Sequence, residues 1–272
     1  MIGDAAMVSM LPSKSRSDSR NLIDGVASMP NEPTPAKWGE VMVSLADSLI
    51  KDVLRTSATE ENIALAEKAL SQVPAIDTSP LALIAQARIC RAKGDHNGAL
   101  NACNKALGCD STLTEASIQK AFALVFLGKP KDAIVTAVDL GQRGADSDNL
   151  NWLFGRAYFS LATDPDTLPE AAAKYYDNAI YWLQKSVEQS PERWYVRAHL
   201  IGAYALAKRL EEPGAKAALI EYREKFKAWS LHPVIKNWAD HLRFQGDCHD
   251  HFKAAIDALL KGLEEAQANG FP

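Results

Sequence analysis

Small residues recur at a fixed interval through the middle of this 272-residue chain. Ala87, Ala121 and Gly155 are each 34 residues apart. The same interval separates Gly94 from Gly128, Ala99 from Ala133, and the members of the series Cys90, Leu124 and Tyr158. Small side chains are needed where two elements pack closely, so the interval marks one such contact in each unit. An internal period of about 20–50 residues is typical of solenoids and other repeat proteins, and no other feature limits the fold as strongly.

Within each unit the apolar residues have the spacing of α-helices. From Trp38 onward they recur three and four positions apart, as at Val41, Leu45 and Leu49. No stretch alternates apolar and polar residues with β-branched enrichment, and no Asn-Gly or Asp-Gly turn separates two such stretches. The sequence therefore predicts an all-α fold built from helix pairs.

The clearest units are 80–113 and 114–147, each with two helical segments around a glycine turn. This arrangement resembles the tetratricopeptide repeat, in which each 34-residue unit is an antiparallel helix pair. The resemblance implies a right-handed α-solenoid. The chain departs from the family's pattern at four positions: Gln86 and Lys120 replace Leu, and Ser111 and Ala145 replace Pro.

The remaining segments complete the predicted organisation. Residues 1–36 lack a helical or strand period and are expected to form a flexible tail. Residues 37–272 are expected to form one solenoid. Its parts are a helix pair at 38–74, repeats at 80–113, 114–147, 148–191 and 195–229, and capping helices at 232–270. In the third repeat Gly155 and Ala179 are 24 residues apart, whereas the equivalent small residues of the two preceding repeats are 12 apart. Pro169 suits the start of a lengthened second helix.

Several short stretches between residues 38 and 272 carry a second, less specific resemblance. They are Thr59-Glu60-Glu61-Asn62, Leu127-Gly128-Lys129-Pro130, Trp182-Leu183-Gln184-Lys185-Ser186 and Arg197-Ala198-His199-Leu200. Together they resemble the C-terminal repeat region of bacterial adenylate/guanylate cyclase-like and transcriptional-activator proteins. The resemblance implies a regulatory or partner-binding module. It implies no cyclase activity, because nothing in this chain resembles the α/β catalytic domain of those proteins.

Composition argues against several classes of partner. The formal net charge is −4 and the isoelectric point about 5.9, which gives no basic field for nucleic acid. No window approaches the length of apolar sequence that spans a bilayer, and no secretory signal is apparent, so we expect no membrane insertion and a cytoplasmic location. Four cysteines are too few for a disulfide scaffold, and Cys90 and Cys103 are expected to be core residues.

The usual catalytic signatures are absent from the sequence. It contains no glycine-rich phosphate loop, no His-Glu-x-x-His, no Gly-x-Ser-x-Gly and no Cys-x-x-Cys. We therefore predict a non-enzymatic protein without a cofactor. The densest group of metal-ligand residue types is Asp247-Cys248-His249-Asp250-His251, with His241 nearby. Helix capping and solvated histidines explain this cluster more simply than a metal site does.

The predicted binding surface is a strip on the first helices of the repeats, beside their buried faces. We call these residues the repeat strip: Ile84, Arg88, Arg91, Ile118, Phe122, Phe126, Trp152, Arg156, Phe159 and His199. Arg88, Phe122 and Arg156 are 34 residues apart and are expected to be exposed, as anchors for an acidic and apolar protein or peptide. Two alternatives stay open. In the first, the tail or the last helix of this chain fills the concave groove that the repeat strip would line. In the second, the chain is a regulatory or sensor module of a bacterial signalling system.

Overall fold

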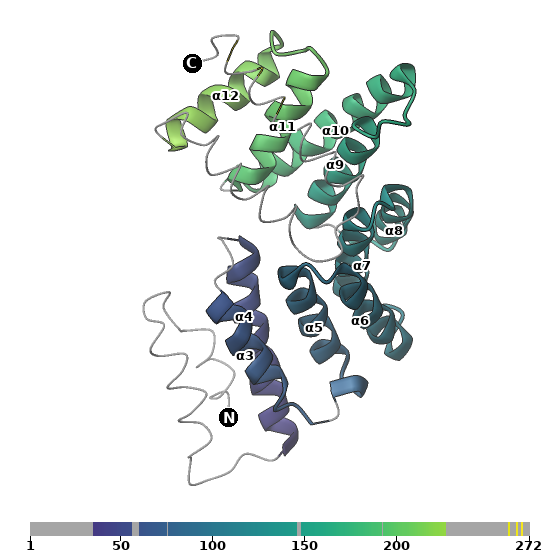
Figure 1. Cartoon of the computed structure of the whole chain (residues 1–272), viewed down its shortest axis with the longest axis vertical. Helices are drawn as coiled ribbons and strands as arrows, with labels where there is room; N and C mark the ends of the chain where they lie inside the picture. The colour runs from purple at the N-terminus through teal and green to yellow at the C-terminus, as the bar shows by residue number, and fades with distance from the viewer. Residues whose placement is uncertain are drawn as a thin grey trace. The chain divides into compact units, whose positions relative to one another are not determined.

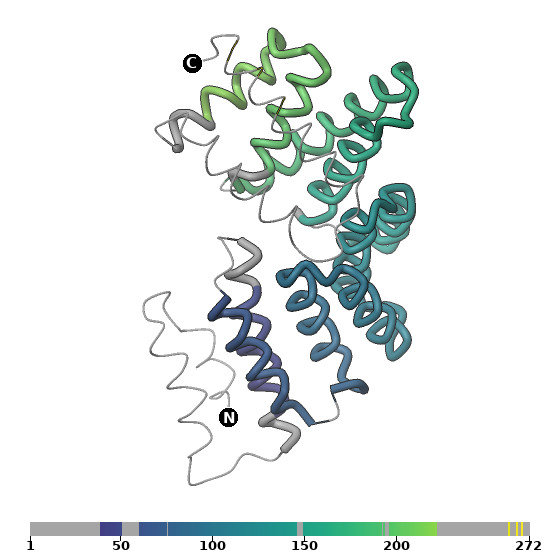
Figure 2. Tube along the Cα trace, viewed as in Figure 1, coloured from purple at the N-terminus to yellow at the C-terminus, as the bar shows by residue number. Residues whose placement is uncertain are grey.

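The structure is a computed structural model that describes residues 35–55, 60–74, 76–145, 148–191 and 193–226, together with Lys261, Glu265 and Ala268 (Figure 1, Figure 2). Over these residues it contains ten α-helices, one short 3-10 helix and no strand. Consecutive helices run in opposite directions as pairs (Figure 1). The fold class is therefore an all-α solenoid of helix pairs, as predicted.

The described helices have the following bounds. The elements are α3 (Pro35–Arg55), α4 (Glu60–Leu70), η1 (Ile76–Thr78), α5 (Pro80–Lys93), α6 (His96–Cys109), α7 (Thr114–Phe126), α8 (Pro130–Gln142), α9 (Asp148–Ala162), α10 (Pro169–Gln189), α11 (Trp194–Leu206) and α12 (Pro213–Phe226). Helix α3 begins at Pro35, so the last two residues of the segment predicted as a tail are helical. The rest of that segment, and most of the predicted caps at 232–270, lie outside the described residues.

Proline begins several of these helices for a simple reason. The first backbone N–H groups of a helix have no partner within the helix, so a residue without an N–H costs nothing there. Pro130 and Pro169 occupy this position in α8 and α10, and Pro80 begins α5. Ser79 also caps α5, because its Oγ accepts a hydrogen bond from the Ala82 N–H at 3.4 Å. The lengthened helix predicted to start at Pro169 is confirmed.

Four described helices are followed by a residue in the left-handed region: Gly94 has a φ angle of 79°, and Gly128, Gly144 and Lys208 have φ angles of 69°, 78° and 58°. The last three share one turn. In each case the next residue donates a backbone hydrogen bond five residues back, from Lys129 to Leu124, from Ala145 to Leu140 and from Arg209 to Tyr204. Glycine is preferred at this position because a Cβ atom is strained there. The fourth repeat lacks the usual glycine, and Lys208 adopts the strained conformation in its place.

The described residues divide into two compact units: those up to residue 93 together with 98–116, and 94–97 together with those from 117 onward. In the first unit, α3, α4 and α5 bury a common core that includes Met42, Leu45, Ile50, Leu65, Ala69 and Ile89. Helix α5 packs on its neighbours through two further groups: Leu83 and Ile84 cluster with Ala106 of α6 and Ala116 of α7, while Ala87 clusters with Ala102 and Cys103 of α6. The small residues of the period thus lie where helices touch.

The second unit shows why the period keeps a glycine at position 155. Gly155 lies in α9 against Leu183 of α10, and both are buried. A Cβ atom at position 155 would come within 2.7 Å of the Leu183 side chain. The two helices can approach this closely only because Gly155 has no side chain. Helix α10 has 21 residues, against 13 in α8, which accommodates the extra residues of the third repeat.

Candidate functional site

The repeat strip is largely buried, which contradicts the expected exposure of its arginines and aromatics. Nine of its ten residues are less than 9% exposed and only Arg91 is partly exposed. Arg88 is 7% exposed, Arg156 6% and Phe122 7%. The prediction failed because helical period identifies which residues lie beside the core of one helix pair, but does not identify what packs over them.

Arg88 is held by two carboxylates within the first unit. Its guanidinium donates one hydrogen bond to Asp47 of α3 and another, at 2.5 Å, to Glu115 of α7. These partners are 41 and 27 residues away in the sequence. A guanidinium offers its donors in a fixed fork, and here two arms of the fork bind acidic side chains of the same protein. Arg88 therefore joins three helices and is not an open anchor for an acidic ligand.

Arg156 has a different environment, in the second unit. Its guanidinium carbon lies 5.4 Å from the centre of the Phe126 ring and 5.1 Å from the centre of the Trp152 ring. A cation within about 6 Å of an aromatic face is attracted by the ring quadrupole, by about 2 kcal/mol or more where water is excluded. The contact joins α7 to α9.

Rings continue from both sides of Arg156. His96 stacks on Phe126 with ring centres 4.3 Å apart. On the other side the edge of His199 meets Trp152 at 4.8 Å and Phe159 at 5.8 Å. Phe159 in turn meets Tyr176 of α10 at 6.4 Å. We call this set the ring column: His96, Phe126, Arg156, Trp152, His199, Phe159 and Tyr176. Five members come from the repeat strip, so the column is what brings those predicted residues together.

Sequence reasoning missed His96 and Tyr176. Both lie on second helices, α6 and α10, and the prediction considered first helices only. His96 follows the Gly94-Asp95 turn directly, and this position was the one signal that could have placed it at the end of the column. Tyr176 lies in the extension of the third repeat, which has no equivalent in the other units.

Tyr176 links the ring column to the end of the chain. The pKa of Tyr176 is raised to about 12, first by burial and second by the negative charge of Glu265. Glu265 is partly buried, while Lys261, one helical turn earlier, is exposed. The carboxylate of Glu265 therefore lies near the phenol of Tyr176.

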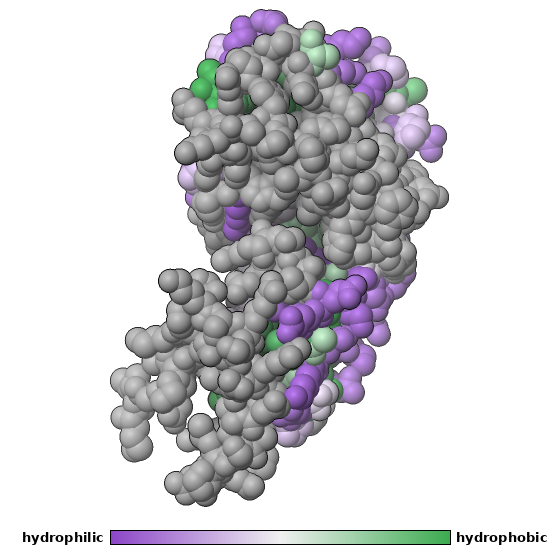
Figure 3. Space-filling model, turned by 60° about the vertical axis from the view of Figure 1, so that its left-hand side comes forward, coloured by the Kyte–Doolittle hydropathy of each residue, from purple (hydrophilic) through white to green (hydrophobic). Residues whose placement is uncertain are grey.

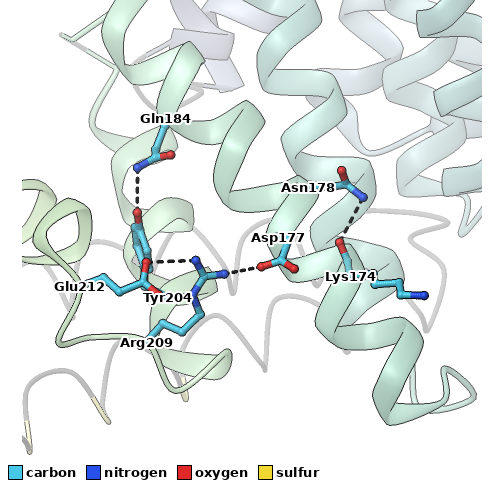
Figure 4. Close-up of polar contacts among 7 residues, drawn as sticks. All are labelled: Lys174, Asp177, Asn178, Gln184, Tyr204, Arg209 and Glu212. Atoms are coloured by element: carbon cyan, nitrogen blue, oxygen red, sulfur yellow. Dashed lines mark hydrogen bonds and ion pairs between the residues drawn. The ribbon is translucent and has the colours of Figure 1, made fainter.

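A polar network fixes the turn between α11 and α12 to α10 (Figure 4). Arg209 donates to both carboxylate oxygens of Glu212, at 2.5 and 3.0 Å, and to Asp177 of α10. The hydrogen bond to Arg209 lowers the pKa of Glu212. Nearby, the Gln184 amide donates to the hydroxyl of buried Tyr204 at 2.7 Å. Each of these polar side chains makes a hydrogen bond within the protein. Networks of this kind typically hold neighbouring helices in place.

Other candidate sites receive no support from the described residues. Among these residues no group of three or more His, Cys, Asp or Glu side chains is placed to hold a metal ion. The predicted cluster around His249 lies outside them. Cys103 packs with Ala87 and Ala102, as expected of a core residue, and Cys90 is half-buried. Within the part of the chain that the structure describes, no helix combines the length and the apolar character needed to cross a bilayer.

Comparison with known proteins gives similarity to solved structures only. No family model and no curated protein matches the chain. It is similar to the structure of MamA residues 41 to the end from Desulfovibrio magneticus RS-1, with 17% identity, a TM-score of 0.42, and 68% of this chain and 94% of that chain covered. It is also similar to a MamA RS-1 ArsTM double mutant, with 17% identity, a TM-score of 0.42, and coverage of 67% and 93%. Similarity at this level carries no information on function.

Proposed function

We propose that this protein is a non-enzymatic scaffold that binds a protein partner. The observation that carries the proposal is the repeat: antiparallel helix pairs follow one another along the described chain. Stacked repeats offer a long surface on which a partner touches several units at once, and such surfaces serve binding in repeat proteins generally. The acidic or apolar peptide expected of an exposed repeat strip loses its two charged anchors, because Arg88 and Arg156 are buried among groups of this chain.

Beside Tyr176, at one end of the ring column, lies a residue from the last segment of the chain, which supports the alternative in which this chain covers its own binding surface. The proximity of Glu265 to Tyr176 supports the last segment of the chain as the covering element. We propose that a partner binds the surface around Tyr176 in competition with the segment that carries Glu265.

Affinity capture from the native cell, followed by calorimetry with the purified partner, tests both parts of this proposal. The full chain should bind one captured protein directly. The Glu265→Lys variant should bind it more tightly, because a lysine beside Tyr176 no longer matches the site that Glu265 occupies. Glu170→Lys is the matched control: it makes the same charge change at an exposed residue of α10.

The outcomes separate the two claims. Failure to find any directly binding protein would contradict the scaffold function. Direct binding with equal affinity for the wild type and Glu265→Lys would keep the scaffold and contradict the competition. A gain in affinity in Glu170→Lys as large as in Glu265→Lys would show that net charge is the cause.

A regulatory or sensor role in a bacterial, cytoplasmic signalling system is a finer proposal within the same function. It rests on the sequence resemblance to cyclase-like and transcriptional-activator proteins. Gene neighbourhood tests it: an adjacent cyclase or transcription factor gene favours regulation, and an assembly or secretion operon favours scaffolding alone.

A further inference from the structure

The outer face of α10 carries a stripe of five exposed residues. They are Lys174, Asp177, Tyr181, Lys185 and Glu188, and the intervals between them are 3, 4, 4 and 3 residues. At about 100° per residue all five stay within about 40° of the direction of Tyr181. At about 1.5 Å per residue the stripe is about 21 Å long. It is therefore a narrow, straight and largely charged line along one helix.

The order of charges in this stripe is self-complementary. Two residues whose numbers add to 362 lie at equal distances on either side of Tyr181. When two copies of the helix run antiparallel with Tyr181 at the centre, such residues oppose each other. In that arrangement Asp177 opposes Lys185, and Lys174 opposes Glu188. Both pairs are attractive. A different register, with Lys174 opposite Lys185, would place like charges together and is disfavoured.

The centre of the stripe has the features of an interface anchor. Tyr181 is 49% exposed, and the edge of its ring packs on Trp182 with centres 5.1 Å apart. Lys185 lies with its Nζ 4.7 Å from the Tyr181 ring centre. Trp182 stacks in turn on Phe154 of α9 at 4.6 Å, so the aromatic base beneath Tyr181 is fixed. Among the residues that the structure describes, the other exposed large apolar side chains are Leu81, Val135, Val138, Leu168 and Ile220. On the one face drawn in Figure 3 the coloured surface is mostly hydrophilic, with small separate hydrophobic patches.

We propose that α10 binds α10 of a second copy of this chain, antiparallel, with a two-fold axis at Tyr181. Symmetric pairs are the commonest protein assemblies, and their interfaces must be complementary to themselves, which is the property of this stripe. The two tyrosines meet at the axis, and each charged pair occurs twice. The proposal is independent of the repeat strip and of any partner bound there.

The expected dimer is weak and sensitive to salt. A standard interface buries about 800 Å² on each partner, and a single helix crossing buries less. Exposed ion pairs each contribute little and are screened by salt. Asp177 also bonds to Arg209 within the same chain, although its side chain stays 66% exposed. The outer pair, Lys174 with Glu188, is therefore the better one to change. Figure 4 shows the side chain of Lys174 extending away from the Arg209 network.

Charge exchange in the full chain tests the proposal by sedimentation equilibrium at low ionic strength. Lys174→Glu and Glu188→Lys should each weaken the dimer about tenfold, because the axis converts two attractive pairs into two repulsive ones. The double variant Lys174→Glu/Glu188→Lys should restore the wild-type dissociation constant, since the opposite charges face each other again. Lys131→Glu on α8 is the control. It makes the same charge change as Lys174→Glu, at an exposed residue outside the stripe.

The results are decisive in either direction. Loss in both single variants, recovery in the double variant and no loss in the control would establish the interface and its register. A wild-type chain that stays monomeric up to about 0.5 mM, a concentration at which weak interfaces associate, would overturn the proposal. Three other results would also overturn it: a dissociation constant unchanged in both single variants, no recovery in the double variant, or an equal weakening of the dimer by Lys131→Glu. Thermal melts of every variant exclude unfolding as the cause.

Discussion

Replacement of Gly155 by alanine should destabilise the protein, although alanine is the better helix former. The added Cβ would lie 2.7 Å from two carbons of the Leu183 side chain and 3.3 Å from the Leu183 backbone nitrogen. A side-chain rotation alone cannot relieve a contact that includes backbone, so α9 and α10 must separate slightly. That separation disturbs the packing of two helices along their shared face.

The magnitude is a difference between two opposing effects. Overpacking a well-packed core costs about 1–3 kcal/mol, and contact with backbone places this site in the upper half of that range. Replacing glycine by alanine within a helix returns about 1 kcal/mol. The net loss in the free energy of unfolding should be about 1–2 kcal/mol. Gly108→Ala in α6 is the matched control, because nothing lies within 4 Å of its Cβ position, and it should stabilise by about 0.5–1 kcal/mol.

Urea denaturation followed by circular dichroism measures both changes. Leu183→Ala should cost less in the Gly155→Ala background than in the wild type, because the shortened side chain leaves space for the new methyl group. Equal stabilisation by Gly155→Ala and Gly108→Ala would refute the claim that the 34-residue period of small residues records helix contacts. Additive effects of the changes at 155 and 183 would refute the specific contact.

Three further changes test particular features of the fold. Lys208→Gly should raise the free energy of unfolding by about 0.5–1 kcal/mol, since glycine relieves the strain at a φ of 58°; thermal melts that show no gain would contradict a left-handed turn there. Gln184→Leu should cost about 1–2 kcal/mol, because it leaves the buried Tyr204 hydroxyl without its donor, and an unchanged urea midpoint would argue against that hydrogen bond. Tyr176 has a pKa of about 12, against 10.0 in a free tyrosine. Its contribution to the free energy of unfolding is therefore complete below pH 10 and is lost as the pH rises towards 12. The loss is about 1 kcal/mol after solvent screening. The stability difference between wild type and Tyr176→Phe should therefore fall over that range, and a constant difference would contradict the raised pKa.

Local sequence pattern predicts the elements of this fold well. Pro80, Pro130 and Pro169 begin helices because a missing N–H is tolerated only in the first turn. The spacing from Gly155 to Ala179 predicts the lengthened second helix of the third repeat, which α10 confirms. These features depend on residues a few positions apart, and the period repeats them along the chain.

The environment of the repeat strip could not be predicted in the same way. Arg88 is buried because Asp47 and Glu115, which are far from it in sequence, converge on one guanidinium. Arg156 is buried because Phe126 and Trp152 lie on both sides of it. A period states which residues share a position in successive units, and it contains no information on contacts between different positions of different units. The period alone therefore predicts that an arginine beside the buried stripe is exposed.

The central claim is that the repeat strip belongs to the interior of the protein. The stability of Arg88→Glu/Arg156→Glu tests it most directly, with Lys131→Glu/Arg143→Glu as a control that makes the same charge change at exposed residues. Reversing two buried cations should cost more than about 3 kcal/mol in the free energy of unfolding, because each new carboxylate is buried among groups that attract a cation. The control pair should cost no more than about 1 kcal/mol. Urea denaturation curves that coincide for the two double variants would contradict the claim and return the strip to the exposed surface.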